Sequence, residues 1–336
     1  MKFSVCLSTG FEGVMHPVPF AGAEDFIAQG KLCERLGYDS VWGNDHVTTQ
    51  DYVRELFPGK PPNFYEPMIV LAAIGAVTTK LKLGTALTVL PMRDPVYLAK
   101  QAITLDQMTN GRFIMAVGLG AYREEFLAWG GSRVEKARRG DMMDEGLQAL
   151  ELLFNKARCS YEGRYYSFKD LEMFPKSKAQ PFPLYVGGHN MEALERAVRY
   201  GQGWLPGWRP LKEMEERIAH LKRRAVELGR NPADIEIAPQ FSVTVDKTLE
   251  AAEKRYMESG LVAHRKSLSY TGRDLSHQVV ANLVGSPDVI LDKIEKLRAI
   301  GVDHCSALMF PANSVTEVNE QIEWFAADVM AKVGTN

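Results

Sequence analysis

The sequence predicts an α/β protein, namely a single (β/α)₈ TIM barrel with insertions in its top-face loops. Short apolar stretches recur along the 336 residues, and a longer amphipathic stretch follows each of them. The short stretches lack the strict apolar–polar alternation of a strand with one exposed face. Apolar strands that alternate with helices indicate a parallel sheet covered by helices. Eight strand–helix pairs favour a closed barrel over an open, doubly wound sheet.

The strands and helices are expected at intervals through the whole chain. Strands are expected at residues 3–7, 40–42, 83–87, 113–118, 184–186, 203–205, 236–243 and 304–310. Helices are expected near residues 22–36, 67–79, 95–109, 135–156, 190–200, 211–228, 287–300 and 315–332. Because no low-complexity linker or internal repeat interrupts this pattern, residues 1–336 are expected to form one domain.

Glycine and proline residues mark several of the helix ends. A glycine that follows a helical stretch accepts the positive φ of a C-terminal cap at little cost, as expected at Gly37, Gly229 and Gly301. A proline suits the first turn of a helix, where no backbone N–H is needed, as expected at Pro67, Pro95 and Pro287.

Three segments are longer than a minimal barrel requires. They are residues 46–66, which are rich in Pro, Tyr and Phe, residues 158–182, and residues 246–286. A short hairpin is expected around Glu162 and Gly163, and the third segment is expected to be helical at first and then rich in turns. Long barrel loops usually have a function, and on the top face they commonly shape or cover the pocket.

Composition argues against several functional classes. A net charge of −2 without long runs of one sign disfavours nucleic-acid binding. No cysteine pair has CxxC spacing and no HxH or HxxxH pair occurs, so neither a disulfide framework nor a metal site is expected. No signal peptide is evident, and no apolar run reaches the length of about 18 residues that a membrane span needs. We therefore expect a cytoplasmic protein without membrane, nucleic-acid or metal binding.

A barrel places its catalytic residues at the carboxyl ends of its strands. Asp45 and His46 directly follow the second expected strand. Histidine titrates near neutral pH and an acidic neighbour can orient its ring, so this pair is a candidate for proton transfer. A loop histidine that is hydrogen-bonded to the backbone explains the same two residues, and the local pattern leaves both interpretations open.

Glycines follow the fourth and fifth strands. Gly118 and Gly120 let a cofactor approach the backbone, but Arg123 stands where a dinucleotide fingerprint needs its third glycine. The turn after the fifth strand leads into a helix with Asn190 as the expected N-cap, and free N–H groups there suit a phosphate. A purely structural turn remains the alternative. The arginine pairs 138–139 and 223–224 are interpreted as solvated helix faces.

Four stretches carry a resemblance to a known family. The central one is GTALTVLPMRDPVYLAKQAITLDQMTNGRF, residues 84–113, which continues through AVGLGAYREEFLAWG. The others are GYDSVWGNDHV, PLYVGGHNMEALERAVRYGQGWLP and VGSPDVILDKIEKLRAIGVDH. In these stretches, which cover most of the chain, the sequence resembles the bacterial luciferase-like flavin-dependent oxidoreductases.

The resemblance implies a flavin site at the top of the barrel. It implies a cis peptide bond between Ala86 and Leu87 behind the flavin ring, and an active-site His46, with Asp45 beside it, at the reactive edge of the ring. It also implies contacts from two backbone segments, with Gly120, Ala121 and Tyr122 lining the cofactor and with Gly187, Gly188 and His189 at its phosphate.

Two departures from the family narrow the expected activity. Luciferase itself has a cysteine where this chain has Gly118 and a basic residue where it has Leu119, so light emission is not implied. Relatives that oxidise sugar phosphates with the deazaflavin F420 carry an acid where this chain has Ala121, which argues against that substrate class.

The resemblance implies an enzyme. Because the sequence lacks a nicotinamide fingerprint, its cofactor is expected to arrive already reduced, from a separate flavin or F420 reductase. A monooxygenase that uses reduced FMN and O₂ on a small organic substrate is expected, with His46 as general acid or base. Leu87, Trp42 and Phe11 are expected to exclude water beneath a lid from residues 246–286. The alternatives are an F420-dependent hydride-transfer oxidoreductase and a flavin-binding barrel without turnover. A homodimer is expected, because relatives commonly pair through helices beside the second and third strands.

Overall fold

The structure is a computed structural model that describes residues 1–7, 9, 21–59, 61–267 and 277–333. Within these residues, ten strands form one parallel sheet in the order β11-β10-β12-β1-β2-β3-β4-β7-β8-β9. The strands are β1 (Lys2–Leu7), β2 (Ser40–Gly43), β3 (Lys82–Val89), β4 (Phe113–Gly118), β7 (Leu184–Gly187), β8 (Gly203–Leu205), β9 (Glu236–Ile237), β10 (Gln240–Val245), β11 (Leu283–Gly285) and β12 (His304–Met309).

The sheet is curled, because one segment of the chain pairs with strands from both of its ends. β9 pairs in parallel with β8, whereas β10, which begins three residues later, pairs in parallel with β12. Ser306 on β12 donates its backbone N–H to Pro239 between the two strands, at 2.9 Å. The fold is therefore TIM-barrel-like, with the carboxyl ends of the strands gathered at one mouth.

The expected count of eight strands is not confirmed. The strand expected at residues 236–243 is two strands, and the break falls at Pro239, which has no N–H to offer a ladder. β11 was also not expected, because it lies in the segment 246–286 that the sequence marks as an insertion. Its three residues, Leu283–Gly285, are too few for a periodic pattern, yet they pair with β10.

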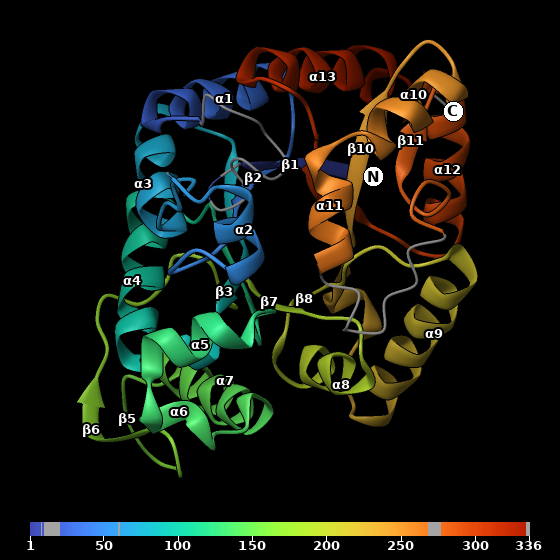
Figure 1. Ribbon diagram of the computed structural model, residues 1–336. Coiled ribbons are helices and arrows are strands. Elements are labelled where there is room, and N and C mark those ends of the chain that lie inside the picture. The colour runs from blue at the N-terminus through green and yellow to red at the C-terminus, as the bar shows by residue number, and fades with distance from the viewer. Residues whose placement is uncertain (8, 10–20, 60, 268–276, 334–336) are drawn as a thin grey trace.

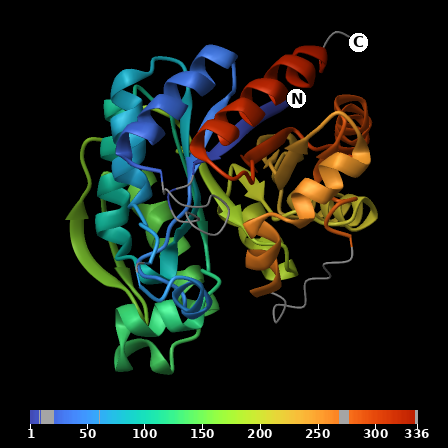
Figure 2. The same ribbon diagram turned by 45° about the horizontal axis from the view of Figure 1, so that its top comes forward.

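Helices cover the outer face of the curled sheet (Figures 1 and 2). The eight expected helices are present as α1 (Ala23–Leu36), α3 (Pro67–Val77), α4 (Pro95–Met108), α7 (Arg139–Asn155), α8 (Met191–Tyr200), α9 (Leu211–Glu227), α12 (Pro287–Ala299) and α13 (Val315–Asp328). The expected caps are confirmed, with φ of 82°, 71° and 95° at Gly37, Gly229 and Gly301.

The three long segments carry further elements. Segment 46–66 contains α2 (Asp51–Leu56), and segment 158–182 forms the expected hairpin from β5 (Arg158–Glu162) and β6 (Ser167–Glu172). Segment 246–286 contributes α10 (Leu249–Met257) and α11 (Gly260–Ser267) before β11. After β4 come the short helices α5 (Arg123–Gly130) and α6 (Ser132–Glu135). Among the described helices, none has the length and apolar character to cross a membrane.

Apolar side chains fill both faces of the sheet. On β1, Phe3, Val5 and Leu7 belong to the large cluster between the sheet and its helices, whereas Cys6 belongs to a second cluster on the inner face. This division follows the two-residue period of a strand. Trp42 is fully buried in the inner cluster, so the floor beneath the mouth is closed by packed side chains.

Candidate active site

A cavity opens at the mouth, where the carboxyl ends of β2, β3 and β4 lie side by side. Because all three strands run in parallel, the loops that follow them meet at the same edge of the sheet. The structure brings seven of the predicted site residues together in the lining of this cavity, namely Asp45, His46, Ala86, Leu87, Gly120, Ala121 and Tyr122.

His46 is held by a carboxylate from a distant part of the chain. Its Nδ1 lies 3.0 Å from Oε2 of Glu125, which α5 carries. The carboxylate can only accept, so this contact calls for a hydrogen on Nδ1. The side-chain amide of Gln50 lies against the same nitrogen, with its Nε2 2.7 Å from Nδ1. The side chain of His46 is 13% exposed and that of Glu125 is 5% exposed, so the contact is shielded from water at the cavity wall.

Glu125 is itself fixed by the loop that carries His46. Its Oε1 accepts hydrogen bonds from the backbone N–H groups of Val47 and Thr48. Burial alone raises the pKa of Glu125, but the hydrogen bonds from His46 and Val47 outweigh burial and hold this pKa below its ordinary value. Glu125 is therefore a carboxylate at neutral pH, and it orients the imidazole.

The carboxylate of Asp45 is bonded to groups at and just after the end of β3. Its Oδ2 accepts from the backbone N–H of Val89 at 2.9 Å, and its Oδ1 accepts from Nη2 of Arg93 at 2.6 Å. Burial raises the pKa of this carboxyl in spite of Arg93. Asp45 thus ties the end of β2 to the end of β3, and the acidic partner of His46 is Glu125.

Leu87 forms part of the apolar lining of the cavity. The peptide bond between Ala86 and Leu87 is cis, as expected. A Cβ placed on Gly118 or on Gly187 would overlap the Leu87 side chain, which therefore fills the space above these two glycines. The glycines at the ends of β4 and β7 are required by this close approach.

The turn after β7 lies at the same edge of the sheet but, among the described residues, is not part of the His46 cavity. The N–H of Gly188 donates to Leu205 at 3.3 Å, and its carbonyl accepts from Trp204 Nε1 at 2.8 Å. His189 lines a separate hollow with Arg217, which donates to the carbonyl of His189. The expected N-cap is confirmed, because Oδ1 of Asn190 accepts from the N–H of Ala193 at 2.9 Å.

Comparison with known proteins places the chain in a family. The profile of the luciferase-like monooxygenases matches residues 1–304, which is nearly the whole chain. The chain belongs to the luciferase-like monooxygenase family. It is accordingly an enzyme, an oxidoreductase of a family that includes FMN-dependent monooxygenases and F420-dependent dehydrogenases.

Both FMN-dependent and F420-dependent members of this family are similar to the chain in sequence. The FMNH₂-dependent dimethylsulfone monooxygenase of Pseudomonas putida is 25% identical over 297 residues, which are 81% of this chain and 79% of the relative. The F420-dependent glucose-6-phosphate dehydrogenase of Microbacterium testaceum is 28% identical over 229 residues, which are 66% of this chain and 65% of the relative.

The fold is shared with solved structures. A monooxygenase of Streptomyces bottropensis superimposes with a TM-score of 0.80 and 22% identity, covering 98% of this chain and 99% of its own. The ten-stranded curled sheet and the mouth that holds His46 thus belong to a luciferase-like architecture.

Two residues of this luciferase-like site were missed by sequence reasoning. Glu125 stands 79 positions from His46, and nothing in its local pattern indicates that it faces a histidine. Arg139 was interpreted as part of a solvated helix face, but it lines the cavity and donates from Nη1 to the carbonyl of Gly120 at 2.9 Å. Its neighbour Arg138 is exposed, as expected. Arg138 and Arg139 stand at the start of α7, where a helical pattern does not yet show which of two adjacent residues is buried.

One further residue expected in the lining, Trp42, is placed differently. Trp42 lies beneath the cavity in the inner cluster and has no exposed surface. Phe11 lies outside the described residues, as does part of the expected lid at 268–276.

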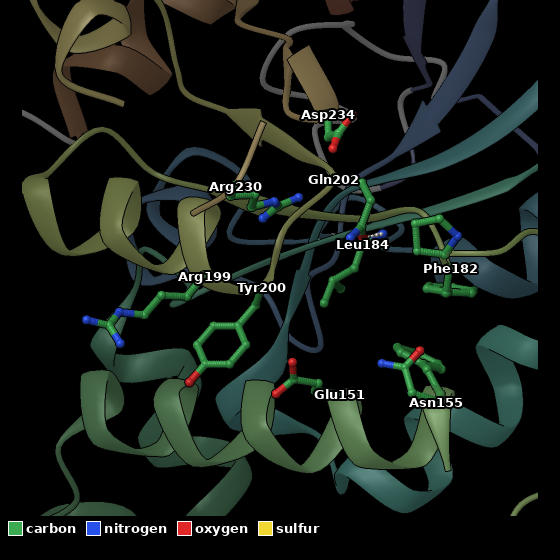
Figure 3. A pocket seen from close by; sticks show the side chains of 11 residues that line it. Glu151, Asn155, Phe182, Leu184, Arg199, Tyr200, Gln202, Arg230 and Asp234 are labelled. Carbon is green, nitrogen blue, oxygen red and sulfur yellow. Dashed lines mark hydrogen bonds between the residues drawn. The ribbon is translucent and has the colours of Figure 1, made fainter. Parts of the chain in front are cut away.

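A larger hollow lies at the opposite edge of the sheet, near the amino ends of β7, β8 and β9. It has a volume of about 630 Å³, and Arg230, Tyr200 and Glu151 point toward it (Figure 3). Arg230 already donates to the carbonyls of Val198 and Gly201 at the end of α8. Because this edge of a barrel usually serves stability, we assign the chemistry to the smaller cavity around His46.

Proposed function

We propose that this luciferase-like enzyme is a monooxygenase that uses reduced FMN and O₂ to oxygenate a small organic substrate. The observation that carries the proposal is the His46–Glu125 pair, which lines the same cavity as the apolar residues Ala86 and Leu87. A proton-carrying group in a cavity with apolar lining suits a flat aromatic redox cofactor. The dimethylsulfone monooxygenase, which aligns over more of this chain than the F420-dependent relative, supports FMN.

The residues present fit such a cofactor. Ala86 and Leu87 would lie behind the ring, and the backbone of residues 120–122 would lie along it. Arg139 provides a cation at Gly120 that suits a phosphate, and the N-terminus of α8 after Gly188 provides a second group of N–H donors. When bound, reduced FMN supplies the two electrons that O₂ activation requires.

His46 would hold or move a proton at Nε2. Glu125 and Gln50 both lie against Nδ1, and we infer that Nε2 is the nitrogen that exchanges a proton with the reacting groups. Glu125 acts through His46 and is a positioning residue. We assign Asp45 to holding Val89 and Arg93 at the end of β3, where it shapes the wall of the cavity.

An F420-dependent hydride transfer is the second candidate. The F420-dependent relative supports it, and a histidine held by a carboxylate can serve as acid or base in either chemistry. The two candidates differ in the cofactor that binds and in whether oxygen is consumed.

The wider organisation is inferred in the same way. Residues 236–245, counted as one strand, give eight strands of a closed (β/α)₈ barrel with β11 outside it, in a single domain over residues 1–336. We place the enzyme in the cytoplasm, where a separate reductase would supply its reduced cofactor.

A homodimer through α3 and α4 is supported by their exposed apolar side chains. Ile69 on α3 is 68% exposed, and Tyr97 and Met108 on α4 are 74% and 72% exposed. The two helices lie side by side on the outer face of the sheet (Figure 1). Exposed apolar side chains grouped on neighbouring elements are typical of a protein–protein contact.

The proposal is tested with the purified protein and three cofactors. FMN, reduced FMN and F420 are titrated in turn, and oxygen uptake is followed with reduced FMN. We expect tight binding of reduced FMN and oxygen consumption coupled to a substrate. Tight F420 binding without oxygen uptake would overturn the monooxygenase proposal in favour of hydride transfer.

The role of His46 is tested separately by His46→Ala. We expect cofactor affinity to stay within about twofold while turnover falls on the order of 100-fold or more, as for loss of a general acid or base. Unchanged turnover would remove His46 from the chemistry.

A further inference from the structure

A buried arginine, Arg265, lines the His46 cavity and has no role in the cofactor site described above. Arg265 belongs to α11, which follows α10 in the chain (Figure 1), and it lines the cavity together with Gln240 of β10. It is 6% exposed, and it lines the same cavity as His46 and Leu87. The segment of α11 is one of those that the sequence marks as longer than a minimal barrel needs.

The guanidinium of Arg265 has no acidic partner among the described residues. Its Nη2 lies 3.9 Å from the sulfur of Met309, and its Nε has no hydrogen-bond partner. Burial lowers the pKa of Arg265, but an arginine stays charged at neutral pH. The structure therefore buries a positive charge with at least one donor unused.

The neighbouring groups do not neutralise this charge. Burial raises the pKa of the Cys6 thiol to about 12 and also raises the pKa of Tyr256, so both are neutral at pH 7. The other charged neighbour, Arg209, has the same sign as Arg265. A buried, uncompensated charge is costly, and such groups pair with an ion of opposite sign or mark a functional site.

We propose that Arg265 binds an anionic group of the substrate, a carboxylate or a sulfonate. The guanidinium presents a planar set of donors that matches two oxygens of such a group. Met309 and Leu87 in the same cavity would contact the apolar body of that substrate. The inference rests on the proposed function in that the substrate and the cofactor share this mouth.

The place of Arg265 in the fold favours the substrate over the cofactor phosphate. Met309, which Nη2 of Arg265 approaches, lies on β12, and the β9–β10 segment and β8 lie between β12 and β7, which leads to the turn at Gly188. The cation nearer to the proposed phosphate position is Arg139, which is bonded to Gly120. The two arginines thus mark two different parts of the cavity.

The test measures ligand binding rather than turnover, so its result does not depend on the proposed reaction. Octanoate, octane-1-sulfonate and neutral octan-1-ol are titrated calorimetrically into the FMN-loaded protein and into the cofactor-free protein. We expect both anions to bind more tightly than the alcohol. In Arg265→Met, their affinity should fall on the order of 10- to 100-fold, the effect of losing a charged hydrogen bond. Arg265→Lys should retain part of the affinity.

Lys266→Met is the matched control, because it removes one positive charge from the same helix at an exposed neighbour. Its anion affinity should equal that of the wild type. Anion affinities that are equal in the wild type and in Arg265→Met would overturn the proposal, as would a wild type that binds neither anion better than octan-1-ol. If Arg265→Met weakened FMN binding and left anion binding unchanged, the arginine would belong to the cofactor.

The melting temperature of the ligand-free protein tests whether Arg265 has a purely structural role. Removal of an unpaired buried charge should leave the melting temperature of Arg265→Met equal to or above that of the wild type. A lower melting temperature combined with unchanged anion affinity would make Arg265 a packing residue and would overturn the proposal.

Discussion

Nδ1 of His46 lies 3.0 Å from Oε2 of Glu125, across 79 residues of sequence and between the loop after β2 and helix α5. The same carboxylate accepts from the backbone of Val47, so it fixes both the ring and the loop that carries it. The orientation of the imidazole is thereby set in part by a residue far from His46 in the sequence.

Glu125→Gln should lower turnover without lowering cofactor affinity. The amide keeps the size of the side chain but loses the negative charge beside the imidazole of His46, so we expect kcat to fall on the order of 10- to 100-fold. The pH dependence of kcat should change in shape, which a packing defect would not cause. Glu124→Gln, at the adjacent position of α5, is the control. Equal kcat for Glu125→Gln and the wild type would show that the contact does not matter for the chemistry.

Gly118→Ala should weaken cofactor binding through Leu87. The new Cβ overlaps the side chain of Leu87. Because Leu87 is also packed against Gly187, we expect its side chain to move into the cavity. Overpacking of this kind costs about 1–3 kcal/mol. We expect the Kd for FMN to rise about tenfold, and Leu87→Ala in the same chain to restore much of the affinity. An unchanged Kd in Gly118→Ala would mean that Leu87 does not border the cofactor.

Local chemistry made much of the fold predictable. The caps at Gly37 and Asn190 depend on residues within one turn, and the eight long helices have amphipathic stretches that stand out without tertiary context. The strand break at Pro239 and the three-residue β11 were missed, because both depend on pairing with strands far away in sequence.

The site was predictable only where a motif or strand end marked it. His46 and the cis bond before Leu87 came from the resemblance together with strand ends; His46 lines the cavity, and the bond between Ala86 and Leu87 is cis. The partner of His46 was not predictable, because Asp45 is adjacent in sequence but turns toward Arg93. Arg265 carries no local signal either, since its charge is informative only once its burial is known.

The acid stability of the fold should depend on Glu236 at the amino-terminal edge of the sheet. Its carboxylate accepts from Lys2 Nζ at 2.8 Å and from Tyr185 Oη at 2.9 Å, and it lies 2.8 Å from Nδ1 of His304. Burial alone raises the pKa of Glu236, but the partners His304 and Lys2 outweigh burial and lower this pKa from 4.5 to about 2. A lowered pKa in the folded state stabilises the protein above the unfolded value, and that contribution is lost as the pH falls from 4.5 toward 2.

Glu236→Gln should therefore lose about 3 kcal/mol of unfolding free energy at neutral pH. Urea unfolding of both proteins at pH values from about 7 to 3 measures the difference, which should shrink as the pH falls. A difference that stayed constant over this range would show that the loss arises from packing rather than from the charge.

The exposed face of α3 and α4 should mediate self-association. Tyr97 is 74% exposed and lies on α4 with Met108, and a tyrosine at the centre of an interface commonly contributes about 2 kcal/mol or more. Tyr97→Glu places a charge on this face, so we expect the dimer to dissociate with a Kd higher on the order of 30-fold. Light scattering after gel filtration over a dilution series measures this. Val226→Glu, at a 65% exposed apolar position on α9, should leave the mass unchanged. If Tyr97→Glu and the wild type had the same mass at every concentration, the interface would lie elsewhere or the protein would be a monomer.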